Sequence, residues 1–352
     1  MRSKLVAVTG AVAVLLTAAG PAVAKGPKHD LEFLGQAVLP TGTMFMDTTV
    51  GGLSSITYDA RNGVFYAVSD DPARVRYYTV ALDLADERLS NGDVRFDDVT
   101  DLLAPGGVPY AASAVDPEGL ALTKDRELIF TSEGFANSLV DPFVRRYSLD
   151  GTFLGSLPVP QDFLPNVERT RGVRQNLGFE SAGVPPNGRF AFVATENALV
   201  QDGPPATVAN GSPARIVRYQ LPSGRLDRQW TYVTDPVAEP PVPPTNFSVN
   251  GVVELLPLNN RFLIAMERSF SVGAPDTGNT IRLYRVELPG AGGEASKTLL
   301  LDLDALHIPL DNVEGMTLGP RLPDGRRSLV LVSDNNFAPS QFTQFLLFAL
   351  DR

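Results

Sequence analysis

A unit of two short apolar strands framed by acidic residues recurs along the chain, and it constrains the fold more than any other feature. In each copy an acid opens an apolar strand, a turn follows, and a second apolar strand ends in another acid. Four complete copies pair Glu118 with Glu133, Glu180 with Glu196, Glu254 with Glu267, and Glu314 with Asp334. An earlier copy keeps its second acid, Asp70, but has Ser54 and Ser55 in place of the first. Repeats of short strands at this spacing predict the blades of a β-propeller.

The segments between the acids support an all-β fold. Runs such as 64–68 and 329–332 are rich in β-branched and aromatic residues, and turn formers bound them. A third strand follows in each unit, and several units continue into a fourth. The last unit ends too early for a fourth strand, so we expect residues 31–39 to supply it and close the ring; a loose N-terminal arm is the alternative. Five units are visible, but the long connections at 197–214 and 234–250 could hide another, which predicts five or six four-stranded blades.

The first residues have the pattern of a secretory signal peptide. Arg2 and Lys4 precede a short apolar stretch, and Ala22-Val23-Ala24 offers a cleavage site with small residues. We therefore expect a signal peptide at 1–24, a single propeller domain at 25–352, and a secreted, extracellular protein with no membrane attachment after cleavage. An uncleaved anchor is the alternative.

Composition narrows the classes of partner. The chain has 40 acidic and 30 basic residues and a net charge of −10, which disfavours nucleic acid and favours cations. It has no cysteine and two histidines, so cysteine chemistry is excluded and a zinc site is disfavoured. We expect a monomer acting on a small molecule.

Propeller topology should bring the repeated acids together. The first strand of a blade lines the central channel and the second runs back beside it, so the start of one and the end of the other share a face. The expected metal ligands at this mouth are Asp70, Glu118, Glu133, Glu180, Glu196, Glu254, Glu314 and Asp334. Crowded carboxylates need compensation by shared protons, arginine or cations. Their all-oxygen ligand set favours Ca²⁺, with arginine pairing alone or another ion as alternatives.

Basic residues beside the acids suggest a role in binding anions. Arg169, Arg171 and Arg174 precede the strand that begins near Glu180, and arginine grips phosphate oxygens well; an exposed basic loop is the alternative. No nucleophile elbow or P-loop is present. His307 is interpreted as a packing residue rather than a catalytic base.

A set of short motifs in order resembles a known family. The motifs are Gly51-Gly-Leu-Ser54, Asp116-Pro-Glu-Gly-Leu120, Thr131-Ser-Glu-Gly134, Asn176-Leu-Gly-Phe-Glu180, Asn250-Gly-Val-Val-Glu254, Met266-Glu-Arg-Ser269, Asn312-Val-Glu-Gly315 and Val332-Ser-Asp-Asn335. Together they resemble the bacterial "esterase-like activity of phytase" family over about residues 47–350. The resemblance implies a secreted β-propeller with phytase-like or phosphatase-like hydrolysis of phosphoric esters that depends on calcium.

The leading hypothesis is therefore a secreted, metal-dependent phosphoric-ester hydrolase that uses metal-activated water. We assign catalytic roles to Glu180, Glu267, Arg268 and Arg174, the arginines stabilising charge on the phosphate. Two alternatives stay open at this point: a non-catalytic binding propeller stabilised by calcium, and a hydrolase of lactones or carboxylic esters.

Overall fold

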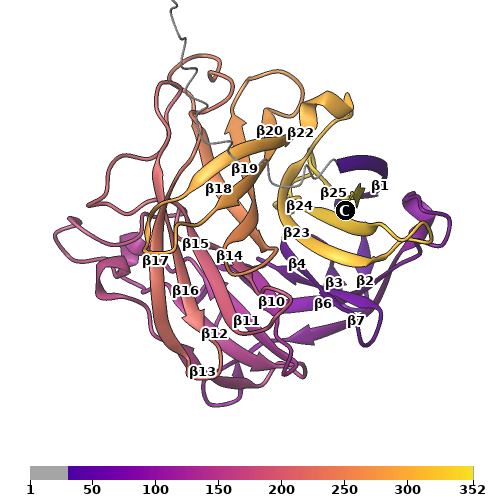
Figure 1. The fold of residues 1–352 in the computed structure, drawn as a ribbon, viewed down its shortest axis with the longest axis horizontal. Coiled ribbons are helices and arrows are strands. Elements are labelled where there is room, and N and C mark those ends of the chain that lie inside the picture. Colours follow the sequence, from indigo (N-terminus) through magenta and orange to yellow (C-terminus); the bar gives the residue numbers. More distant parts are fainter. Residues whose placement is uncertain (1–30, 352) are drawn as a thin grey trace, which may run out of the picture.

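The computed structural model describes residues 31–351, which form a five-bladed β-propeller (Figure 1). The predicted signal peptide at 1–24 lies outside the described residues. Helical structure within residues 31–351 is limited to four short 3₁₀ turns, η1 (Asn91–Asp93), η2 (Ala136–Ser138), η3 (Gln161–Phe163) and η4 (Leu303–Leu306). In this range, no helix has the length and apolar character required to span a membrane.

Each blade is an antiparallel sheet that starts at the central channel and runs outward. Blade 1 contains β4 (Leu53–Asp59), β5 (Val64–Ser69), β6 (Arg76–Leu82) and β7 (Val94–Asp101). Blade 2 contains β10 (Pro117–Leu122), β11 (Glu127–Ser132), β12 (Phe143–Ser148) and β13 (Phe153–Leu157). Blade 3 contains β14 (Phe179–Gly183), β15 (Phe190–Ala198), β16 (Pro213–Gln220) and β17 (Arg225–Val233), with the short β21 (Gly293–Glu294) added in parallel.

The last two blades complete the ring. Blade 4 contains β18 (Ser248–Pro257), β19 (Phe262–Ser271), β20 (Asn279–Glu287) and β22 (Ser296–Asp302). Blade 5 contains β23 (Asn312–Arg321), β24 (Arg327–Asp334), β25 (Phe342–Leu350) and β1 (Leu31–Pro40). Two small hairpins lie outside the blades, β2 (Met44–Phe45) with β3 (Thr48–Thr49) and β8 (Leu103–Ala104) with β9 (Val108–Pro109).

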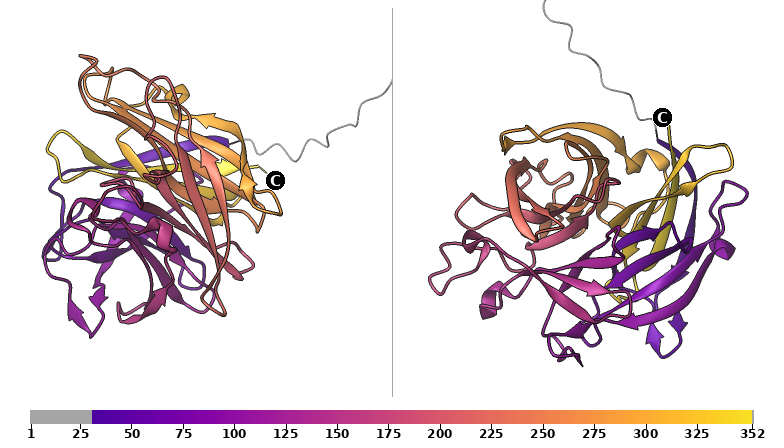
Figure 2. Two further views of the ribbon diagram at one scale, coloured as in Figure 1. Left: turned by 90° about the vertical axis from the view of Figure 1, so that its left-hand side faces the viewer. Right: turned by 60° about the horizontal axis from the view of Figure 1, so that its bottom comes forward.

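The N-terminal strand closes the ring as the sequence predicts. β1 pairs antiparallel with β25, from Leu31 opposite Leu350 to Pro40 opposite Phe342. The indigo N-terminal strand accordingly lies beside the yellow C-terminal strands (Figure 2). This pairing covers an edge of blade 5 that would otherwise present unpaired backbone groups. The connections at 199–212 and 234–247 contain no strand, so the described chain has five blades and not six.

The core lies between blades. Successive side chains of a strand point to opposite faces, so Phe65 and Ala67 of β5 pack toward blade 5 while Tyr66 and Val68 pack toward blade 2. The same alternation gives residues 31–351 five apolar clusters, one at each contact between neighbouring blades. These clusters hold the five inner strands side by side around the channel, which fixes where their polar ends meet.

Candidate metal centre and active-site cavity

In blades 2, 3 and 5 the first acid of the repeat lies at a β-bulge on the inner strand. The register of the inner pair shifts at Ser54 in blade 1, Glu180 in blade 3 and Glu314 in blade 5, and across Glu118 and Gly119 in blade 2. A bulge leaves one residue out of the ladder and redirects its side chain. The bulges thus direct three glutamates toward the channel, and blade 1 has a serine at the equivalent place.

The second acid lies at or near the end of the next strand, and in blades 1 and 3 its amide is hydrogen-bonded to the residue just before the inner strand. The amides of Asp70 and Glu196 donate to the carbonyls of Gly52 and Gly178 at 2.8 and 2.7 Å. Gly52 has φ +62°, and a Cβ there would lie 1.8 Å from Asp70 Oδ1. A side chain at residue 52 would therefore displace the carboxylate.

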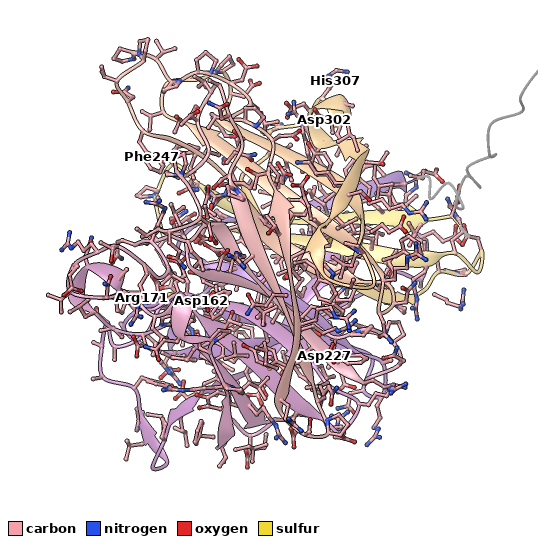
Figure 3. The ribbon with its side chains drawn as sticks, turned by 60° about the vertical axis from the view of Figure 1, so that its left-hand side comes forward. Asp162, Arg171, Asp227, Phe247, Asp302 and His307 are labelled. Carbon is pink, nitrogen blue, oxygen red and sulfur yellow. The ribbon has the colours of Figure 1, made fainter. Side chains whose placement is uncertain are left out.

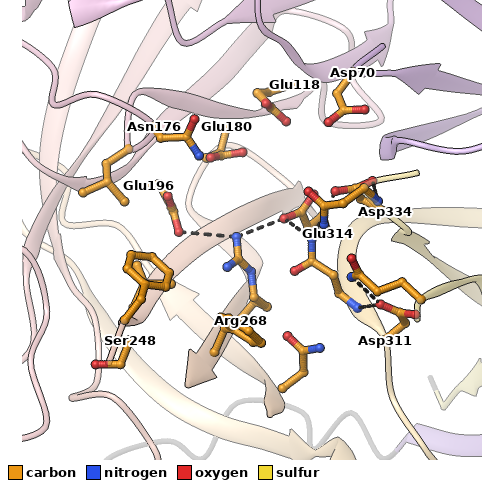
Figure 4. A pocket seen from close by; sticks show the side chains of 18 of the residues that line it. Asp70, Glu118, Asn176, Glu180, Glu196, Ser248, Arg268, Asp311, Glu314 and Asp334 are labelled. Atoms are coloured by element: carbon orange, nitrogen blue, oxygen red, sulfur yellow. Dashed lines mark hydrogen bonds and ion pairs between the residues drawn. The ribbon is translucent and has the colours of Figure 1, made fainter. Parts of the chain in front are cut away.

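These two sets of acids meet in a cavity of about 790 Å³ at one mouth of the channel (Figure 4). Six of the predicted ligands line it: Asp70, Glu118, Glu180, Glu196, Glu314 and Asp334. Asp116, which is not among the ligands expected from the sequence, lines it too. The position of Asp116 directly before the inner strand of blade 2 could have identified it in the sequence. In the structure its amide donates to Ser132 Oγ at 3.1 Å.

Two carboxylate triads share Glu133. In each of the groups Asp116–Glu118–Glu133 and Glu133–Glu180–Glu196, one oxygen per residue lies within 4.8 Å of the others. Glu133 is 1% exposed; its Oε1 accepts a 2.6 Å hydrogen bond from Gly178 N, and its Oε2 has no hydrogen-bond partner. Asp70 Oδ1 and Glu196 Oε1 also accept no hydrogen bond.

Burial makes these acids hard to ionise. Burial raises the pKa of Glu133 to about 8, and burial with repulsion from Glu314 raises the pKa of Asp334 to about 8. Burial likewise raises the pKa of Glu314 to about 7, against the opposing effect of Arg268, and that of Asp116 to about 6. Burial, and after it repulsion from neighbouring carboxylates, also raises the pKa values of Asp70, Glu118 and Glu180.

Arg268 is the single basic side chain among the residues that line the cavity. Its Nη2 lies 2.9 Å from Glu314 Oε1 and 3.6 Å from Glu196 Oε1, between the two acids (Figure 4). Burial lowers the pKa of Arg268, but the negative charges of Glu314 and Glu196 outweigh burial and raise this pKa overall. Its Nε has no hydrogen-bond partner. The Arg268 side chain is 12% exposed, so part of it is accessible from the cavity.

In blade 4 the β-bulge lies one residue before the first acid of the repeat, whereas in blades 3 and 5 it lies at the acid itself. The bulge of blade 4 falls between Val252 and Glu254, so Val253 takes the place that Glu314 has in blade 5. On the neighbouring strand, Arg268 opposite Gly251 takes the place of Asp334 opposite Asn312. A shift of one residue turns each side chain to the other face of the sheet. This shift brings Arg268, and not Glu267, to the cavity.

Glu254 and Glu267, both predicted as site residues, do not line the cavity. Glu254 is 1% exposed and accepts hydrogen bonds from Ser55 Oγ at 2.7 Å and Leu255 N at 2.9 Å, and burial raises its pKa well above the usual range. Glu267 accepts hydrogen bonds from Tyr232, the Asp235 amide and Asn250, and forms an ion pair with Lys297 at 2.5 Å. Glu267 thus links blades 3 and 4 behind the cavity wall.

The basic segment lies beside the main cavity. Arg169, Arg171 and Arg174 line a second hollow of about 200 Å³. Arg174 donates to the carbonyls of Ala198 at 3.1 Å and Gly203 at 2.5 Å, and burial lowers its pKa. Arg171 lies toward the same side as Phe247 in Figure 3, whereas His307 is exposed at an outer tip of the molecule. The interpretation of His307 as a packing residue is therefore wrong.

The carboxylates present fit a hard divalent cation. Within residues 31–351, no ion pair involves Asp70, Glu118, Glu133, Glu180 or Asp334, so pairing with arginine does not account for the cluster. Three oxygens of the cluster, Asp70 Oδ1, Glu133 Oε2 and Glu196 Oε1, have no hydrogen-bond partner, and carboxylate oxygens are the ligands that Ca²⁺ and Mg²⁺ prefer. The buried acidic clusters could therefore hold a metal ion.

Residues 48–337 match the family described as phytase-like, with the words "esterase-like activity of phytase". The chain belongs to this family. The phytase-like match confirms the resemblance found from the motifs and covers strands of all five blades. None of the curated proteins matches the chain.

Solved structures of low sequence identity match this phytase-like protein. The Dos1 propeller matches with a TM-score of 0.39 and 5% identity, over 86% of this chain and 69% of that chain. The endo-arabinase of Bacteroides thetaiotaomicron matches with a TM-score of 0.45 and 12% identity, over 90% of this chain and 97% of that chain. We draw no conclusion about activity from either.

Proposed function

We propose that this protein is a secreted, monomeric hydrolase of phosphoric esters that depends on calcium. The observation that carries the proposal is the pair of buried carboxylate triads around Glu133, next to a cavity with a single guanidinium. Membership of the phytase-like family supports ester hydrolysis as the reaction class. The apolar segment with small residues at 22–24 supports secretion.

The two triads, with Asp116, Glu118, Glu133, Glu180 and Glu196, would hold the metal. A bound divalent cation would polarise a phosphoryl oxygen and increase the acidity of a water molecule. Ionised carboxylates repel one another by about 1–4 kcal/mol for a pair 4 Å apart, so a cation is needed to keep several of them charged near neutral pH. Because Glu133 belongs to both triads, its charge is central to binding.

Arg268 and Glu180 have the catalytic roles in this proposal. Arg268 lines the cavity with a partly exposed side chain, so it would bind a phosphoryl oxygen and stabilise the charge that develops there. Glu180 lines the cavity beside Glu196 and would accept a proton from the attacking water at a carboxylate oxygen. Glu254, Glu267 and Arg174, whose hydrogen bonds are made elsewhere, receive no catalytic role.

The test is phosphate release from 4-nitrophenyl phosphate and from phytate, with added calcium and with a chelator. The proposal expects turnover that requires calcium and falls strongly in the variant Glu180→Gln. Calcium-dependent melting with no release of phosphate would favour a binding propeller. Turnover of 4-nitrophenyl acetate or a lactone, without turnover of phosphoesters, would favour a carboxylic-ester hydrolase.

A further inference from the structure

The cavity is poorly suited to a substrate with many phosphate groups. Nine of the residues that line it are acidic and one is basic. Bound cations would offset the charge of the triads, but Asp276 and Asp311 also line the cavity and lie outside both triads. Asp276 is exposed. A second or third phosphate group beside the one at Arg268 would therefore meet further carboxylates and no further basic side chain.

One wall of the cavity is apolar. It is formed by the side chains Leu177, Pro205, Ala206, Phe247, Val249 and Phe270. Phe247 is 63% exposed, although large aromatic side chains are usually buried. Its ring lies 6.3 Å from that of Phe270, with the ring planes tilted by 43°. The two rings thus present an aromatic surface to whatever enters the cavity.

The apolar wall adjoins the guanidinium because of the strand geometry. Arg268 and Phe270 are two residues apart on β19, so their side chains share one face of blade 4. Val249 lies directly opposite Phe270 in the ladder, and Phe247 precedes β18. The Phe247 carbonyl accepts a 3.0 Å hydrogen bond from Val272 N, which holds this segment against the end of β19. A phosphate ester whose phosphate group is bound at Arg268 would have its alcohol portion next to the two rings.

We infer that the substrate is a monophosphate ester of an apolar, aromatic alcohol, and not a polyphosphate such as phytate. This inference rests on the proposed function. In the reaction ROPO₃²⁻ + H₂O → ROH + HPO₄²⁻, the water oxygen forms a new bond to phosphorus and the ester P–O bond breaks. One water proton passes by way of the carboxylate to the leaving alkoxide, and the other stays on the phosphate. The released alcohol is the part that contacts Phe247 and Phe270.

Kinetics with three substrates test the inference. In the presence of calcium, kcat/KM should be at least tenfold higher for 1-naphthyl phosphate than for glycerol 2-phosphate or phytate. Phe247→Ala should lower kcat/KM for 1-naphthyl phosphate about 2- to 12-fold, mainly through KM, because it removes one aromatic contact. The same variant should lower kcat/KM for glycerol 2-phosphate by a smaller factor, because glycerol makes no aromatic contact. Leu154→Ala, at a 47% exposed apolar residue on β13, is the matched control and should not change kcat/KM for either substrate.

A binding measurement separates this inference from the proposed function. Calorimetry with calcium and 1-naphthylphosphonate, which cannot be hydrolysed, should show weaker binding by Phe247→Ala than by the wild type and by Leu154→Ala. If no phosphoester is hydrolysed but this loss of binding is seen, the proposed hydrolysis fails, and the assignment of Phe247 to a surface that binds aromatic phosphate analogues stands. Equal phosphonate binding by all three proteins would overturn the inference. A kcat/KM for phytate that equals or exceeds the kcat/KM for 1-naphthyl phosphate would also overturn the inference.

Discussion

Glu133 contributes a carboxylate to both triads and has one oxygen without a hydrogen-bond partner. The variant Glu133→Gln keeps an acceptor for the Gly178 amide but removes the charge. Calcium affinity should fall at least tenfold, or about 1.4 kcal/mol, in a calorimetric titration. The metal-free variant should melt no lower than the wild type, because glutamine cannot acquire the buried charge that the glutamate takes on as pH rises toward 8.

The exposed Glu294 provides the matched control for this substitution. Glu294→Gln makes the same chemical change outside the cavity and should bind calcium as the wild type does. Wild-type calcium affinity in Glu133→Gln would show that the shared carboxylate is not a ligand.

Arg268 carries the single positive charge of the cavity lining. Arg268→Met should lower kcat about 100-fold at saturating calcium, because a preorganised donor for the phosphoryl group is lost. Arg268→Lys should recover only part of the rate, since an ammonium group lacks the planar fork of the guanidinium.

A readout of calcium binding separates this catalytic role from a structural one. Both Arg268 variants should still bind calcium, because the arginine is not a ligand. Unchanged kcat in Arg268→Met would rule out the assigned role.

At the scale of the strand pair, the one-residue displacement of blade 4 decides which side chain faces the cavity. Glu267→Gln should leave calcium affinity unchanged but lower stability by about 1–3 kcal/mol, because Glu267 anchors a buried hydrogen-bond network. Thermal melting should show the loss, and calorimetry with calcium should show none. A loss of calcium affinity as large as that in Glu133→Gln would contradict the register described here.

The sequence predicts the acids of blades 2, 3 and 5 well but misplaces those of blade 4. In the other blades a serine or threonine directly precedes the second acid, as in Ser132-Glu133 and Thr195-Glu196. In blade 4 the residue before Glu267 is Met266. This difference was visible in the sequence, but the position of the bulge that reverses the two faces depends on the pairing of β18 with β19 and not on a local motif.

At the scale of the whole molecule, the propeller and its closure follow from the repeat and from the strand at 31–39. Each blade needs an apolar face against two neighbours, and the alternating side chains of the second strands supply it. The number of blades did not follow from the sequence alone. The connections at 199–212 and 234–247 are long enough for additional strands, but the structure shows them as irregular segments.

The raised pKa values of the acids predict how stability changes with pH. Glu133 and Asp334 have folded-state pKa values of about 8, against ordinary values near 4.5 and 3.8. Their neutral forms are favoured in the folded state, so the stability that they contribute is present at low pH and is lost as pH rises toward 8. The metal-free protein should therefore melt at a higher temperature at pH 5 than at pH 8.

Calcium should reverse this trend, because a bound cation favours the ionised carboxylates. The increase in Tm on adding calcium should be larger at pH 8 than at pH 5, by several degrees; 1 kcal/mol corresponds to roughly 2–4 °C for domains of 150–250 residues. Differential scanning calorimetry at the two pH values, with calcium and with chelator, measures both effects. A metal-free protein that becomes more stable from pH 5 to pH 8 would contradict the assignment of these buried acids.

The most direct test of the metal centre is a crystal structure of the wild-type protein grown with calcium, with anomalous differences collected at a long wavelength. We predict an anomalous peak within ligand distance, about 2.3–2.6 Å, of oxygens from Glu133 and at least two other members of the triads. A map in which these carboxylates keep their positions with no anomalous peak among them would contradict the account.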